Sequence, residues 1–169
     1  MNGSTVYECP SACPSPGRHP SPGRFAPPPS TGSWRITLPH STAAVPVARA
    51  LVRTALTASE HTADLDTAEL LTAELVANAV EHTAGRGPIE LVVEVRPAGC
   101  QVEVHDPDPA PPGNLARPTV EEPDVWQEGG RGLLLIRALS SSCGHRPTES
   151  GKAVWFRLPA LASRRWSPA

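Results

Sequence analysis

The sequence predicts a two-layer α+β sandwich, in which a mixed, mostly antiparallel sheet carries helices on one face. Two helical patterns follow each other, near residues 40–59 and 64–82. Two alternating segments, PIELVVEVRP and GCQVEVHDP, come next and read as a hairpin. Because strands and helices do not alternate along the chain, antiparallel pairing is favoured and a doubly wound nucleotide fold is excluded.

Length and composition limit the classes of function. The chain has 169 residues and a formal net charge of −2, which fits one domain with extra segments and no general nucleic-acid or membrane-surface binder. No window approaches the ~18 consecutive apolar residues of a membrane helix. The N-terminus lacks the apolar core of a secretory signal. We therefore expect a soluble cytoplasmic protein that contacts neither nucleic acid nor membrane directly.

Composition divides the chain into three parts. Residues 1–31 are rich in Pro, Ser and Gly and repeat PSPGR, so we predict a disordered tail that cannot bury a core. Residues 32–160 form the folded domain, and residues 161–169 a short C-terminal tail.

The first elements of the domain follow from its apolar pattern. WRITLP, beginning at Trp34, alternates as a strand does. In the next helix Pro46 fits the first turn, where its missing N–H costs nothing. We predict an inner face of Val47, Leu51, Val52 and Ala55.

A longer helix is predicted from about Asp64 to about His82. Asp64 and Asp66 favour its N-terminus, and Gly85 and Gly87 end it.

The remainder of the domain is predicted to contain a long loop, a helix and two strands. The loop DPDPAPPGNLARPTVEEPDVWQEGGRG is polar and proline-rich, as binding loops often are. GLLLIRALSSSC predicts a short helix, HRPTES a turn, and GKAVWFRLPA the closing strand.

The four cysteines give little sign of a metal site. Cys9 and Cys13 lie in the proline-rich tract without two further ligands beside them. Cys100 and Cys143 lie in apolar surroundings and are interpreted as reduced core thiols.

A polar stripe runs along the second helix. Glu74, Asn78 and His82 recur at every fourth position of ELVANAVEHT. At ~100° per residue, Asn78 lies ~60° and Glu74 ~100° from Leu75, the centre of the buried face. The stripe therefore borders the apolar face, as a wet helix edge or a binding site would; for His82 a cap on the helix C-terminus is favoured.

Two further features lie downstream of the stripe. Asp106 ends a strand at the start of the long loop. Gly129-Gly130-Arg131-Gly132 leads directly into a helix, where backbone N–H groups can approach an anion. Each feature alone is equally typical of an ordinary loop or turn.

In combination, these segments resemble the GHKL (histidine kinase-like) ATPase superfamily and, within it, the stand-alone anti-sigma-factor serine kinases. ELVANAVEHT is similar to the N box of that branch, GGRGLLLI to its glycine box, and GKAVWFRLP to its terminal strand. The resemblance covers residues 34–159 and implies the ATP-binding fold of the superfamily.

The resemblance implies roles for six residues and two cofactors, ATP and Mg²⁺. Asn78 would coordinate Mg²⁺, Glu74 would act as general base, and Asp106 would accept a hydrogen bond from the adenine amino group. Backbone amides of Gly130 and Gly132 would hold phosphates, and Arg131 would add charge there.

The sequence departs from the family pattern at two places. The usual D-x-G-x-G is here Asp106-Pro107-Asp108-Pro109-Ala110, which has no glycine. Relatives often carry threonine, whose hydroxyl helps to hold adenine, where this chain has Ala153.

These observations leave two functional hypotheses. In the first, the protein phosphorylates a serine on an anti-sigma-factor antagonist and binds a sigma factor. In the second, it is a non-catalytic partner-binding module in which nucleotide is structural or absent. The catalytic fragment of a two-component histidine kinase is disfavoured, because residues 1–31 offer no dimerisation helix. The oligomeric state stays open, although relatives commonly form homodimers.

Overall fold

The computed structural model describes residues 5–8, 31–59, 63–83, 85–112 and 131–161. Within these ranges the chain forms one six-stranded sheet in the order β1-β5-β6-β4-β3-β2. The strands are β1 Thr5–Glu8, β2 Gly32–Leu38, β3 Ile89–Arg96, β4 Gly99–Asp106, β5 Ser142–Thr148 and β6 Gly151–Pro159.

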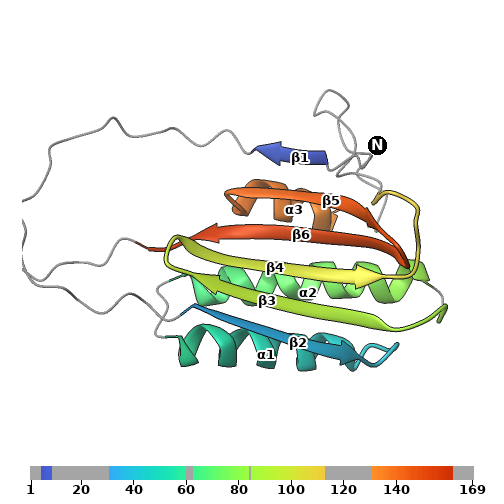
Figure 1. Cartoon of the computed structure of the whole chain (residues 1–169), viewed down its shortest axis with the longest axis horizontal. Helices are drawn as coiled ribbons and strands as arrows, with labels where there is room; N and C mark the ends of the chain where they lie inside the picture. The colour runs from blue at the N-terminus through green and yellow to red at the C-terminus, as the bar shows by residue number, and fades with distance from the viewer. Residues whose placement is uncertain (1–4, 9–30, 60–62, 84, 113–130, 162–169) are drawn as a thin grey trace, which may run out of the picture.

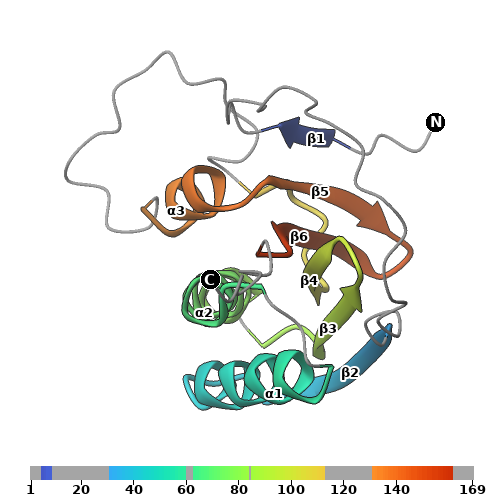
Figure 2. The same cartoon turned by 90° about the vertical axis from the view of Figure 1, so that its left-hand side faces the viewer.

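Three helices of the described part lie on one face of the sheet (Figures 1 and 2). They are α1 Ala44–Ala58, α2 Leu65–Thr83 and α3 Arg131–Leu139. The predicted two-layer α+β sandwich is therefore confirmed. Every strand pairing in the described ranges is antiparallel; the prediction of a mostly antiparallel sheet is confirmed, and no parallel pair is found there to make the sheet mixed.

The first helix follows the prediction except on part of its inner face. Pro46 lies in its first turn, and Val52 and Ala55 are buried. Val47, which was predicted to face the core, is 43% exposed. Ala44, Ala48 and Leu56 complete the buried face instead, because the stripe that contacts the sheet is offset from the predicted one.

The long helix α2 begins and ends as its sequence predicts. Asp64 Oδ1 accepts the Thr67 N–H at 3.1 Å, which satisfies one of the free amides of the first turn. After the helix, Gly85 adopts φ +79°, a conformation that glycine reaches without steric cost. Leu75, the predicted centre of the buried face, is buried together with Ala68, Leu71 and Ala79.

The predicted hairpin is confirmed, whereas the end of α3 is not where the sequence placed it. Strands β3 and β4 pair from Glu90 with His105 to Arg96 with Gly99. Helix α3 ends at Leu139, and Ser142 to Thr148 form β5 rather than helix and turn. The cross-strand partner β6 supplies the pairing that the local sequence does not indicate.

Part of the N-terminal segment also differs from the prediction. Residues 5–8 form β1 and pair with β5, although a disordered tail was predicted there. The rest of that tail lies outside the described residues. Strands β1 and β2 lie at opposite edges of the sheet.

The hydrophobic core lies between the sheet and the helices. Its fully buried side chains come from both layers and include Val52, Leu71, Val76, Leu91, Val102 and Phe156. Cys100 and Cys143 are free and buried, as predicted, and burial raises the pKa of Cys100 to about 11. None of the helices in the described ranges is long and apolar enough to cross a membrane.

Neighbouring leucines on α2 test its orientation. Leu71 is fully buried and Leu70 is 43% exposed. We expect Leu71→Ala to lower the free energy of unfolding by about 2–5 kcal/mol, because it leaves a cavity. Leu70→Ala should change it by no more than about 0.5 kcal/mol. Urea denaturation measures both, and equal losses would contradict the placement of α2.

Candidate functional site

A pocket opens between α2 and the strands β4 and β6. Its volume is about 200 Å³, below the ~300–1,000 Å³ of typical small-molecule sites, so it suits a heterocyclic base better than a whole nucleotide. Its apolar walls are Leu75, Ala79, Val104, Ala110, Pro111, Pro112, Leu133 and Val154. Its polar residues are Asn78, His82, Asp106, Asp108 and Lys152.

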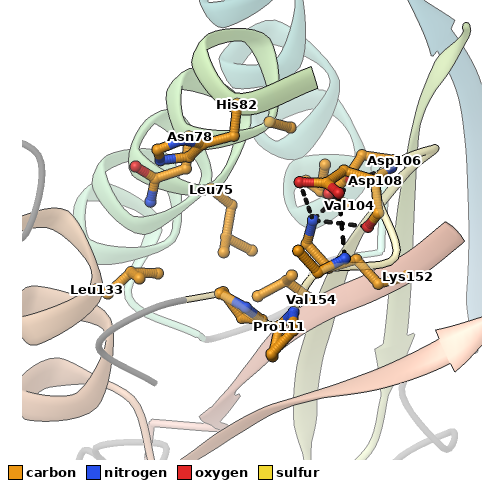
Figure 3. A pocket seen from close by; sticks show the side chains of 13 residues that line it. Leu75, Asn78, His82, Val104, Asp106, Asp108, Pro111, Leu133, Lys152 and Val154 are labelled. Atoms are coloured by element: carbon orange, nitrogen blue, oxygen red, sulfur yellow. Dashed lines mark hydrogen bonds and ion pairs between the residues drawn. The ribbon is translucent and has the colours of Figure 1, made fainter. Parts of the chain in front are cut away.

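The polar residues lie at two sides of the pocket (Figure 3). Asn78 and His82 come from α2, whereas Asp106, Asp108 and Lys152 gather where β4 ends and β6 begins. Leu75 lies between the two groups. A flat apolar ligand with polar edges is the shape that such a lining accommodates.

Asn78 carries an unsatisfied amide into the pocket. The residue is half-buried, and its Nδ2 atom is buried without a hydrogen-bond partner among the described residues. A buried amide without a partner is costly unless a ligand or ion completes it. Because a flip exchanges the two ends of an amide, the same position can present oxygen to a cation.

Glu74 lies on the same helix but is not among the residues that line the pocket. It packs against the start of α3: a Cβ atom on Gly132 would collide with Glu74 Oε2 and lie 3.3 Å from Glu74 Cβ. Gly132 is thus required for close approach of the two helices. Gly132, which was predicted to contact phosphate, therefore lies beside Glu74, the candidate general base.

Asp106 is buried and already has partners. It ends β4, is 5% exposed, and its Oδ1 accepts the Asp108 N–H at 2.9 Å. The same oxygen accepts a hydrogen bond from Lys152 Nζ at 2.9 Å. The predicted adenine acceptor therefore belongs to a buried ion pair.

Lys152 is a pocket residue that was not predicted from the sequence. It lies directly opposite Asp106 in the β4–β6 register and is 6% exposed. Its Nζ also donates to the Asp108 carbonyl at 2.9 Å. The alternation of GKAVWF could have indicated that Lys152 faces the helices. Lys152 shares a strand face with Val154 and the core residue Phe156.

That alternation also corrects the expectation for Ala153. A residue at this position was expected to help hold adenine, but Ala153 is not among the residues that line the pocket. Successive side chains of a strand point to opposite faces, so position 153 faces away from the helices. The loss of a threonine there does not weaken the pocket directly.

The glycine-free segment after Asp106 is held by its aspartates. The Asp106 and Asp108 carboxylates accept the N–H groups of Asp108 and Ala110, at 2.9 and 3.1 Å, which are Asx turns. The hydrogen bond from Ala110, followed by the charges of Lys152 and Arg86, holds the pKa of Asp108 below its ordinary value despite the opposing effect of desolvation.

His82 was interpreted as a cap on the end of α2, but its side chain lines the pocket beside Asn78 (Figure 3). His40 contacts this end of the helix instead. Its Nε2 accepts the Gly85 N–H at 3.3 Å and forms a short hydrogen bond with Thr83 Oγ1. Only the tertiary fold brings His40 to this helix end.

Two candidate residues cannot be placed. Gly130 and most of the predicted loop lie outside the described residues, as does the side chain of Arg131, the first residue of α3. Within the described part, no three His, Cys, Asp or Glu side chains gather to hold a metal ion. A cation held by Asn78 would therefore need its remaining ligands from elsewhere, as Mg²⁺ commonly takes them from phosphates and water.

The pocket lies within a segment that matches a known protein family. Residues 38–158 match the protein family described as histidine kinase-like ATPase domain. The match includes every residue that lines the pocket. A search of curated proteins found no match.

The buried ion pair gives a test of the site's construction. Lys152→Met leaves the Asp106 carboxylate buried without its cation, so we expect the free energy of unfolding to fall by about 3–5 kcal/mol. The double variant Asp106→Asn/Lys152→Met should regain most of this loss, because no charge remains buried. Urea denaturation of wild type and both variants measures this. A single variant as stable as wild type would contradict the pairing.

Proposed function

The chain belongs to the histidine kinase-like ATPase domain family, and from this premise we propose that it binds ATP with Mg²⁺ and acts as an anti-sigma-factor serine/threonine kinase. The observation that carries the proposal is that Asn78 and Asp106, from different elements, line one pocket. Family membership alone supports the coarser statement, an ATP-binding protein of the histidine kinase-like type.

In this proposal the adenine ring lies between apolar side chains of the two layers. Leu75 and Ala79 of α2 cover one side, and Val104 and Val154 of the sheet the other. Asp106 accepts a hydrogen bond from the 6-amino group, which selects adenine over bases without that donor. The pocket volume of about 200 Å³ fits this assignment, since the ribose and phosphates would extend toward Asn78.

Asn78 is the residue that would contact the phosphate-bound cation. Its amide has no protein partner for Nδ2 among the described residues, and an amide oxygen suits a hard cation. Bound Mg²⁺ would neutralise charge on the phosphates during transfer.

Glu74 is the proposed general base. It accepts the proton of a substrate serine while the serine oxygen forms a bond to the γ-phosphorus and the bond from that phosphorus to the bridging oxygen breaks, which releases ADP. Its side chain packs against Gly132. Gly132 belongs to the glycine box, whose backbone amides would hold the phosphates, and this proximity supports the role of Glu74.

The partners of the proposed kinase are a sigma factor and an anti-sigma-factor antagonist, and the proposal includes a homodimer. They rest on the similarity of ELVANAVEHT, GGRGLLLI and GKAVWFRLP to the anti-sigma-factor kinase branch. Phosphorylation of the antagonist would then decide which of the two proteins the kinase holds.

A second candidate, a non-catalytic partner-binding module, is favoured by two observations. Asp106 is already engaged by Lys152 at 2.9 Å. The segment Asp106–Ala110 has aspartate and alanine where the family has glycines, and its two prolines remove backbone donors. In this alternative nucleotide is structural or absent.

Two substitutions on α2 separate binding from catalysis. Glu74→Gln should leave the Kd for ATP within about threefold and lower phosphoryl transfer by about 10²-fold or more. Asn78→Ala should weaken Mg²⁺-dependent ATP binding by about tenfold or more. Titration calorimetry with and without Mg²⁺ measures binding, and radiolabelled ATP with candidate antagonists measures transfer.

The matched control is Glu81→Gln, the same exchange at an exposed position of the same helix, which should change neither quantity. Failure of the wild type to bind ATP would reject the proposal as a whole. Tight ATP binding without transfer to any antagonist would favour the non-catalytic module.

A further inference from the structure

Two opposite charges face the pocket from neighbouring strands. Asp106 and Lys152 are direct partners in the antiparallel register of β4 and β6, so their side chains project from the same face of the sheet. They are 5% and 6% exposed, respectively, and both line the pocket (Figure 3). The ligand therefore meets an acceptor and a donor side by side.

The ammonium of Lys152 has more donors than the described residues use. It carries three N–H groups, and its hydrogen bonds go to Asp106 Oδ1 and the Asp108 carbonyl, both at 2.9 Å. The next oxygen, Asp108 Oδ2, lies at 3.6 Å, which is beyond hydrogen-bond distance. Within the described part of the chain, one N–H thus has no acceptor.

A role in charge neutralisation alone does not explain this arrangement well. Buried ion pairs are seldom more stable than apolar residues of similar volume, and burying lysine costs side-chain entropy. Charged groups held in a cleft are common at functional sites. The Lys152 ammonium, with one N–H left over at the wall of the pocket, is such a group.

We propose that Lys152 reads the base together with Asp106, by donating a hydrogen bond to a ring nitrogen of adenine. This inference rests on the proposed function. The 6-amino group of adenine is a donor, and the two ring nitrogens that flank it, N1 and N7, are acceptors. A carboxylate beside an ammonium complements this donor–acceptor pair: Asp106 accepts from the amino group while Lys152 donates to the adjacent nitrogen.

The pairing makes Lys152 a specificity-determining residue rather than a structural counterion. A counterion would not distinguish between ligands that differ in one ring nitrogen. A base-reading residue loses its hydrogen bond when that nitrogen is replaced by C–H, and a hydrogen bond from a charged donor contributes about tenfold or more in affinity.

The test compares ATP with 1-deaza-ATP and 7-deaza-ATP by titration calorimetry in the presence of Mg²⁺. For the wild type, one of the two analogues should bind about tenfold or more weakly than ATP, and the other serves as the matched control. For Lys152→Gln this difference should shrink to within about threefold. Glutamine keeps two N–H donors for Asp106 and the Asp108 carbonyl and has none left for the base.

The outcomes separate this inference from the proposed function. Absence of ATP binding to the wild type overturns both. ATP binding with both analogues bound as tightly as ATP overturns only the role of Lys152, as does a tenfold penalty that persists in Lys152→Gln. Thermal unfolding checks that the variant is folded; if it is not, the wild-type comparison of the two analogues decides.

Discussion

The packing of α2 across β4 and β6 is the constraint on which the rest of the structure depends. Leu71, Leu75 and Val76 of α2 are buried in the core between the layers, and burial of apolar side chains is the main source of stability for a helix on a sheet. The same contact fixes the edge of the helix that carries Glu74 and Asn78. Asn78 and His82 of the polar stripe then face the pocket beside the sheet, whereas Glu74 packs against the start of α3.

The sheet register supplies the other half of the site. Asp106 ends β4 directly opposite Lys152 near the start of β6, and Gly151 permits this approach because a Cβ atom there would collide with the Asp106 carbonyl. Its φ of +153° is one that residues with side chains rarely adopt. Backbone geometry thus holds two charges together in a place where desolvation would otherwise disfavour both.

Much of this fold could be predicted from sequence because its signals are local. The capped helix α2 and the β3–β4 hairpin carry periodicity and turn residues within a few positions of each other. The bounds of strand β5 could not be found this way, since HRPTES has turn-forming residues and gains its strand conformation from β6. Lys152 was missed because its partner lies 46 positions away, and only the register brings the two together.

The central claim is that the space between α2 and the β4–β6 strands holds the base of ATP. Titration of methyl-labelled protein with ATP and Mg²⁺, followed by NMR, tests it most directly. The account predicts that the methyl resonances of Leu75, Val104 and Val154, which line the pocket, shift and saturate together. Those of the exposed Val47 and Leu70 should stay in place. Shifts confined to residues outside the pocket would contradict it.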